Sequence, residues 1–395
     1  MRISTPQIYA NGTNGLLRIQ YEQYRLQNQL STGRKVVTPA DDPVAAAQAL
    51  LTEQKKNVNA QFIDNQSNAA AQLAELESLM ASVGEALIQC KSRWIEAGDG
   101  AYGDTQLKSI AEDIRGKFAE ILGAANNADA NGLYRFAGYQ GNTQPFVEQG
   151  GVVSYQGDSG ARQLQVETSR FMDVNFSGRA LFETVPTGNG IFVANAGAGN
   201  VGNGVIDNGS VVGSFNGHSY QLNFSSPTQY TVDDTYGGVT TTSGPFAYGG
   251  SDPISLGGAQ VTLSGATAAG DTFTIEPSRE ESIFTTLNKF INTLESGNAS
   301  SAEFQNAMYR IGASLDQARQ HVSDQRAVVG ARMLEIDNLK TLAEDLNVQY
   351  EAQYSSLVDL DYYSAISDLT QKGLQLQAAQ ESFAKITGLN LFNYI

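Results

Sequence analysis

Cysteine and histidine are almost absent from this sequence. Its 395 residues include one cysteine, Cys90, and two histidines, His218 and His321. A single cysteine excludes a disulfide within the chain, and the apolar series Leu87, Cys90 and Trp94 predicts that this residue is packed in a core. Neither histidine has a second candidate base or metal ligand at a useful spacing. We therefore expect no catalytic residues, no metal site, no cofactor and no enzyme activity.

Positive charge and long apolar runs are also scarce. The formal net charge is −16 at pH 7, which disfavours nucleic acid and anionic membranes as partners because both repel a negative surface. No run of about 18 apolar residues is present, so we expect no membrane-spanning helix. The segment from Met1 to Ala10 lacks a basic stretch followed by an apolar core, and we therefore expect no cleaved signal peptide of the Sec type.

Both ends of the chain carry apolar residues at the spacing of a coiled coil. Residues 8–32 are predicted to be a helix, and residues 336–386 continue the pattern with one phase slip near Ser364. An apolar stripe must be covered, and the simplest cover for each terminal helix is the other. Because so short a helix pair is marginal alone, we expect the ends to become ordered on assembly. The predicted assembly interface comprises Leu16, Ile19, Leu26, Leu30, Leu357, Leu360, Leu369, Leu376 and Phe383.

Capping residues mark the helix boundaries. Gly33 can take the left-handed conformation that ends the first helix, and Asp42 followed by Pro43 is a typical helix start with the carboxylate as N-cap. The helix that begins at Pro43 is expected to reach about Ala97. Later in the chain, Ser-x-x-Glu patterns at 278–281 and 300–303 predict two further helix starts.

The middle of the chain has a different composition. Of the 40 glycines, 24 fall between Gly141 and Gly270. Alternating stretches at 163–174, 219–224, 230–233, 260–263 and 271–276, separated by turn residues, are typical of strands. We predict a multidomain α plus β fold, in which the two arms form a long antiparallel helical bundle or coiled coil and a glycine-rich all-β domain is inserted between them. The predicted domains are a terminal coiled coil (1–45 with 357–395), a helical bundle (46–145 with 281–356) and an outer β domain (146–280).

Several segments resemble the flagellin superfamily of bacterial flagellar proteins. They are MRIST at 1–5, LSTGRKV at 30–36, PADDPVA at 39–45, NGLYRFAGY at 131–139, GDTFTIEP at 270–277 and LNLFNYI at 389–395. Together they lie in or next to both helical arms, whereas residues 176–269 carry little of the resemblance.

This resemblance implies a structural subunit of the bacterial flagellum. Members with these segments polymerise as a layer at the hook–filament junction, on hook-associated protein 1 and below the flagellin filament. They leave the cell through the flagellar type III export apparatus without signal cleavage, after an export chaperone has bound the C-terminal helix. The implied location is extracellular, on the flagellum. The implied partners are further copies of the chain, hook-associated protein 1, flagellin and the chaperone.

Two other functions stay open at this point. Flagellin, the filament subunit, shares the arms and the Ser31-Thr32-Gly33 turn, although the two chain ends and the 134–139 segment favour the junction layer. A secreted adhesin-like surface protein would instead display the β domain to a ligand.

Overall fold

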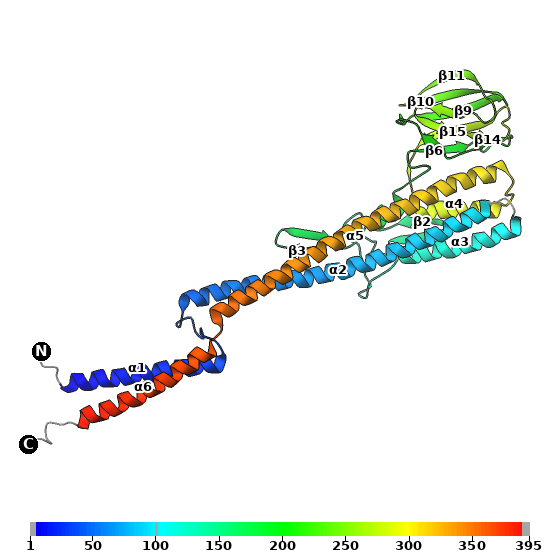
Figure 1. The fold of residues 1–395 in the computed structure, drawn as a ribbon. Helices are drawn as coiled ribbons and strands as arrows, with labels where there is room; N and C mark the ends of the chain where they lie inside the picture. Colours follow the sequence, from blue (N-terminus) through cyan, green and yellow to red (C-terminus); the bar gives the residue numbers. More distant parts are fainter. Residues whose placement is uncertain (1–4, 99–101, 389–395) are drawn as a thin grey trace, which may run out of the picture. The chain divides into compact units, whose positions relative to one another are not determined.

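The computed structural model describes residues 5–98 and 102–388, which form two helical arms with strands between them (Figure 1). The N-terminal arm holds α1 (Thr5–Thr32), α2 (Pro43–Gly98) and α3 (Asp104–Ala125), and the C-terminal arm holds α4 (Ile283–Ser296), α5 (Ala302–Val358) and α6 (Tyr362–Gly388). The predicted fold class is confirmed. The MRIST motif, apart from its last residue, and the LNLFNYI motif lie outside the described residues.

Contacts along the chain divide it into two compact units. One contains residues 1–65 and 338–395, and the other contains residues 66–337. The first unit, which we call the terminal unit, holds α1, α6, the start of α2 and the end of α5. It takes in more of the chain than the terminal coiled coil predicted for 1–45 and 357–395.

The second unit has a helical part whose core uses the apolar faces of α2 to α5. On α2 the buried residues recur at helical spacing, as predicted, and they are Leu73, Leu76, Met80, Val83, Leu87 and Cys90. Burial raises the pKa of the Cys90 thiol to about 12, so this cysteine is a packed apolar residue and not a reactive one. Trp94 donates from Nε1 to the Met308 carbonyl at 2.7 Å, which ties α2 to α5.

Two short hairpins belong to this helical part. They are β1 (Phe146–Gln149) with β2 (Val152–Tyr155), and β3 (Gln163–Glu167) with β4 (Arg170–Asp173). Phe146 packs against Phe182 and against Phe284 of α4, with ring centroids 5.2 and 5.3 Å apart. The outer β domain was predicted to begin at residue 146. Strand β1, which begins there, instead shares a core with the helices.

The later strands form a β module, defined here as residues 187–279. Its main sheet is antiparallel in the order β11-β10-β9-β15-β6. The strands of this sheet are β6 (Phe192–Ala196), β9 (Ser219–Ser226), β10 (Gln229–Tyr236), β11 (Val239–Ala247) and β15 (Thr272–Pro277). Shorter strands complete the module: β7 (Val205–Ile206), β8 (Ser210–Val211), β12 (Ile254–Leu256), β13 (Ala259–Val261) and β14 (Leu263–Ser264). The five alternating stretches predicted from the sequence all contain strands.

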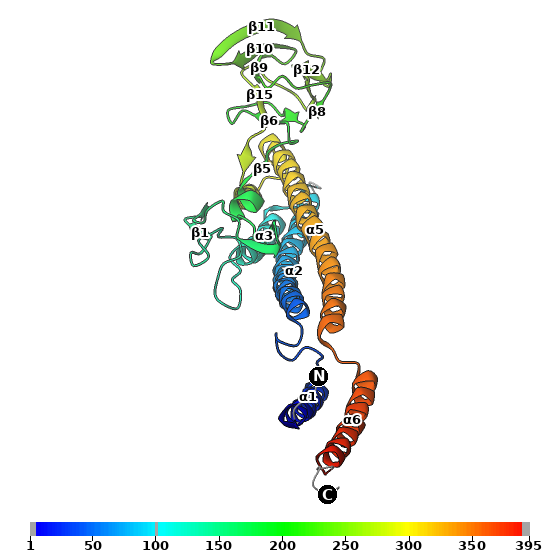
Figure 2. The ribbon, with the colours of Figure 1, turned by 90° about the vertical axis from the view of Figure 1, so that its left-hand side faces the viewer.

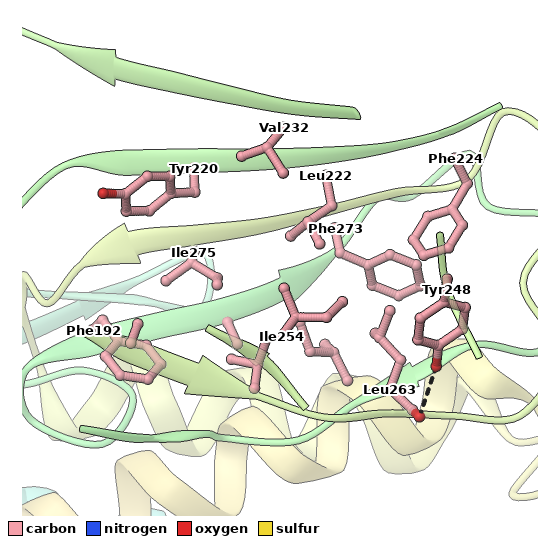
Figure 3. Packing of buried hydrophobic residues seen from close by; sticks show 14 residues of the cluster. Phe192, Tyr220, Leu222, Phe224, Val232, Tyr248, Ile254, Leu263, Phe273 and Ile275 are labelled. Atoms are coloured by element: carbon pink, nitrogen blue, oxygen red, sulfur yellow. Dashed lines mark hydrogen bonds between the residues drawn. The ribbon is translucent and has the colours of Figure 1, made fainter. Parts of the chain in front are cut away.

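The β module has an apolar core of its own (Figure 3). Phe192, Leu222, Phe273 and Ile275 project from the main sheet into this core, where each is almost completely buried. Tyr248 is buried beside them and donates its hydroxyl hydrogen bond to the Leu263 carbonyl at 3.0 Å. All residues of this cluster lie between 192 and 275, so within the described part of the chain the core of the module contains no side chain from the helices.

Two predicted helix starts are corrected by the structure. Helix α4 begins at Ile283, with Ser282 as its N-cap, because residues 280–281 form strand β16 and pair with β5 (Val185–Pro186). Helix α5 begins one residue later than the second Ser-x-x-Glu pattern predicted, with Ser301 Oγ accepting from the Phe304 amide at 3.1 Å. In both places a neighbouring serine takes the capping role. The start of α4 is fixed by the pairing of β16 with β5, which lies about 95 residues earlier in the chain.

Candidate assembly surface

The two terminal helices, α1 and α6, lie side by side (Figures 1 and 2). The sequence predicted this pairing from two apolar stripes, and the structure brings both stripes to the same seam. All nine predicted interface residues are partly buried, from Leu16 on α1 to Phe383 on α6, and none is fully covered. The single chain thus holds its ends as paired helices, and ordering only on assembly remains a prediction.

Phe383 makes the tightest contact of this seam. Its ring meets Tyr9 edge to face, with centroids 5.9 Å apart, and it lies directly over Gly12. A Cβ atom added at Gly12 would come within 2.6 Å of two ring atoms of Phe383. A glycine in mid-helix costs stability in isolation, so its presence here is explained by the space that the ring needs.

One ion pair crosses the same seam. Lys372 Nζ of α6 lies 2.6 Å from Glu22 Oε2 of α1, and each side chain is about one-third exposed. The hydrogen bond from Lys372 lowers the pKa of Glu22 below its ordinary value. This pair fixes the register of the two helices more than it adds stability, because exposed ion pairs contribute little.

The predicted turn at Gly33 joins the two ends of the chain a second time. Gly33 has φ +70°, as expected for a left-handed helix cap, and its carbonyl accepts from the Leu360 amide at 3.0 Å. The Lys35 amide donates to the Val358 carbonyl at 2.7 Å, and Arg34 bridges to Asp359 in antiparallel register. The phase slip expected near Ser364 is therefore a real break between α5 and α6, a few residues earlier.

The start of α2 follows the predicted capping geometry. Asp42 Oδ1 accepts from the Val44 and Ala45 amides at 3.0 and 2.9 Å, and Pro43 is the first helical residue. Farther along α2, Asn59 is buried and donates to the Ala343 carbonyl of α5 at 2.7 Å. These contacts hold the start of α2 and the end of α5 together within the terminal unit.

The sequence analysis missed a second set of apolar residues on the same helices. They are exposed, and we call them the outer stripes: Leu17, Tyr21 and Tyr24 on α1, Val44, Leu51 and Val58 on α2, and Tyr363, Ile366 and Leu374 on α6. Tyr21 is 68 % exposed, Leu51 59 % and Tyr363 88 %. Their spacing of three, four, seven or eight positions was visible in the sequence. The seam residues beside them already form a regular coiled-coil pattern, and this pattern alone is enough to predict the helices.

The histidines take structural positions. His218 Nδ1 lies 2.7 Å from Asp234 Oδ1 and its ring stacks on Tyr236 at 4.4 Å. His321 Nε2 lies 2.8 Å from the Ala180 carbonyl. Among residues 5–98 and 102–388, no group of three or more His, Cys, Asp or Glu side chains is arranged to hold a metal ion. Within the same ranges, no helix is long and apolar enough to cross a membrane.

Comparison with known proteins agrees with this architecture. Residues 3–141 match the bacterial flagellin N-terminal helical region. The chain is 25 % identical to flagellar hook-associated protein 3 of Escherichia coli, over 99 % of each chain, and equally identical to that of Salmonella typhimurium.

Solved structures of related proteins share the fold. The structure of flagellar hook-associated protein 3 from Legionella pneumophila matches with a TM-score of 0.73 at 26 % identity, over 78 % of this chain and 98 % of that one. FlgL of Xanthomonas campestris matches with a TM-score of 0.69 at 27 % identity, over 77 % and 99 %. The chain is therefore a structural component of the bacterial flagellum, similar along its length to flagellar hook-associated protein 3 and carrying a flagellin-type N-terminal helical region.

Proposed function

We propose that this protein forms the junction layer between hook-associated protein 1 and the flagellin filament, and that it assembles through its terminal helices. The observation that carries the proposal is the incomplete burial of the terminal unit. Its helices pair through a half-buried seam and still present the outer stripes to their surroundings. Apolar stripes of this size on paired helices are typical of surfaces that a further protein covers.

The free energy of burying the outer stripes favours contact with several neighbouring subunits. Full burial of a side chain of leucine or tyrosine size contributes roughly 1.5–3 kcal/mol, whereas association costs about 4–15 kcal/mol in lost freedom. A single stripe residue cannot offset that cost, but the stripes of three helices buried together can. We propose that each subunit buries them against adjacent copies, and that the ends of the layer contact hook-associated protein 1 on one side and flagellin on the other.

The same surface explains the proposed route out of the cell. An exposed stripe on α6 would cause premature association in the cytoplasm, so we propose that an export chaperone covers α6 until the chain leaves. The chain then reaches the extracellular flagellum through the flagellar export apparatus without loss of a signal peptide. In this scheme the terminal coiled coil is the inner assembly domain, the helical bundle is intermediate, and the β domain faces solvent.

Point substitutions on the outer stripes of α1 and α6 test the assembly role. In flagellated cells that lack the native gene, we expect a chain with Tyr21→Glu and Tyr363→Glu to be exported but to leave filaments detached from hooks. Tyr236→Glu in the β module is the matched control, because Tyr236 is 65 % exposed, close to Tyr21 at 68 %, and it should support attached filaments. Attached filaments with the double variant, or with residues 357–395 deleted, would contradict the proposal.

Copy number separates the junction layer from the filament itself. A junction protein is a minor species confined to the filament base, whereas flagellin is the bulk protein. Immunogold labelling of intact flagella should therefore mark one position between hook and filament. Labelling along the whole filament would favour the flagellin alternative.

A further inference from the structure

The β module is attached to the helical part of its unit by a narrow connection. The chain enters through β5 and leaves through β16, which pair as a two-stranded ribbon with Pro186 opposite Glu280. Thr187 extends the ribbon, since its amide and hydroxyl both bond to the Arg279 carbonyl, at 2.9 and 3.0 Å. A two-stranded ribbon without a third strand is a marginal support on its own.

The module meets helix α5 through polar side chains. Asn306 reaches residues 204–206, Arg310 Nη1 lies 3.1 Å from Asn195 Oδ1, and Gln317 lies beside Gly190. The apolar core of the module stops at its own residues. Domains joined by small polar interfaces move relative to one another unless a specific contact holds them.

A cleft separates the two parts where they face each other. It has a volume of about 530 Å³ and is lined by Thr187, Val193 and Glu276 on the module side and by Lys289, Arg310 and Ser314 on the helix side. Charged side chains line both walls, and the Lys289–Glu281 pair lies on one of them. The cleft leaves room for the module to tilt about the ribbon.

Asn306 is placed to prevent that tilt. Only 5 % of its surface is exposed, and its amide oxygen and both amide hydrogens are hydrogen-bonded. Its Oδ1 accepts from the Ile206 amide at 2.9 Å, while Nδ2 donates to the Gly204 carbonyl at 3.0 Å and to the Ala302 carbonyl of its own helix at 2.8 Å. A buried hydrogen bond of this kind is costly to break without replacement.

Residues 204–206, to which Asn306 is hydrogen-bonded, are firmly attached to the rest of the module. Strand β7 pairs with β14 through Ile206 and Leu263, and the Asn203 amide donates to the Ala266 carbonyl at 2.7 Å. Gly204 lies against the Phe273 ring, so that an added Cβ would approach it within 2.8 Å. A force on residues 204–206 is therefore transmitted to the core of the module.

We infer that Asn306 is a latch that fixes the orientation of the β module on α5, and that the β5–β16 ribbon is the hinge on which the released module turns. The latch is one buried polar side chain, with the more exposed Arg310–Asn195 hydrogen bond beside it, and among the described residues the apolar core of the module contains no helical side chain. This inference concerns the isolated chain and is independent of any partner in the flagellum.

Distance measurements between two spin labels test the latch. In a Cys90→Ala background, Thr241→Cys places one label on exposed β11 and Ser323→Cys places the other on an exposed site of α5. With Asn306 intact we expect one narrow distance distribution by pulsed electron paramagnetic resonance. Asn306→Ala should shift and broaden it, and Asn306→Asp, which keeps the acceptor for Ile206 but loses the donor for Gly204, should give an intermediate result.

Two controls make the outcome decisive. Gln66→Leu removes a comparably buried amide that donates to the Val166 carbonyl at 2.8 Å, far along the chain from the latch, and should leave the distribution unchanged. Fluorescence of the single tryptophan, Trp94, reports that the helical part of each variant is folded. The latch is overturned if Asn306→Ala gives the same distribution as the parent chain, or if Gln66→Leu broadens it equally.

Discussion

Replacement of Gly12 by alanine tests the pairing of α1 and α6 at a single contact. The added methyl group would occupy space that the Phe383 ring now fills, because the new Cβ would lie 2.6 Å from two ring atoms. Gly15, one turn away on the same helix, has no atom within 4 Å of the corresponding position. The two glycines therefore form a matched pair that differs only in what faces them.

The two substitutions should differ in their effect on stability. An alanine in place of glycine inside a helix stabilises it by about 1 kcal/mol, and Gly15→Ala should show this gain. At Gly12 the same gain is set against an overpacking cost of about 1–3 kcal/mol, because the ring must leave its place over α1 and its contact with Tyr9. We expect Gly12→Ala to be less stable than Gly15→Ala by about 1–3 kcal/mol.

Hydrogen exchange of the α1 amides in the full chain measures the free energy of local opening, which is the relevant quantity for one helix pair in a large protein. The double variant Gly12→Ala with Phe383→Ala should regain about 1 kcal/mol relative to Phe383→Ala alone, since the clash is then gone. Equal protection in Gly12→Ala and Gly15→Ala would refute the reasoning, because it would mean that Phe383 does not cover Gly12.

Three further outcomes follow from other contacts. Asp271 is fully buried and accepts hydrogen bonds from the amides of residues 201, 202 and 268, so Asp271→Ala should destabilise the β module by about 3 kcal/mol or more, measured by calorimetry. Gly33→Ala should weaken the turn by about 1–2 kcal/mol because its φ is +70° and a Cβ would approach Tyr362 Oη, seen as faster exchange of the Leu360 amide. The hydrogen bond from Lys372 lowers the pKa of Glu22 in the folded state. The pair therefore contributes to the stability of the folded state above the ordinary glutamate pKa of 4.5. This contribution is lost as the pH falls through the lowered pKa of the folded state. Exchange protection of α1 should therefore fall in acid, and Lys372→Gln should reduce that dependence.

The helical part of the fold was readable from the sequence because its signals are local. A proline after an aspartate at 42–43 identifies a helix start by chemistry that acts within one turn, and the structure places that start at Pro43. Gly33 could be assigned a left-handed conformation for the same reason. The alternation of residues 219–224 and 271–276 likewise reports two strands that each bury one face.

The errors arose where distant segments decide the structure. Residues 278–281 have the letters of a helix cap, yet the Ser278 hydroxyl donates to the Thr187 carbonyl at 2.8 Å and Glu280 pairs with Pro186. No local pattern reveals this pairing. Phe146, where the β domain was predicted to begin, packs its ring against Phe284 of a helix that follows much later in the chain, and no local pattern reveals this contact either.

The placement of apolar residues in the terminal unit follows a consistent logic. A lone chain that buried its terminal helices completely would have no reason to associate, and one that left both stripes open would aggregate. Here Leu16 and Phe383 lie in a seam that the single chain half buries, while Tyr21 and Tyr363 stay exposed. The seam pairs the two helices, and in the proposed assembly the outer stripes would meet a neighbour as preformed surfaces, which would lower the conformational cost of association. This division also explains why the seam carries an ion pair and a glycine contact that set register, whereas the outer stripes are simple apolar rows.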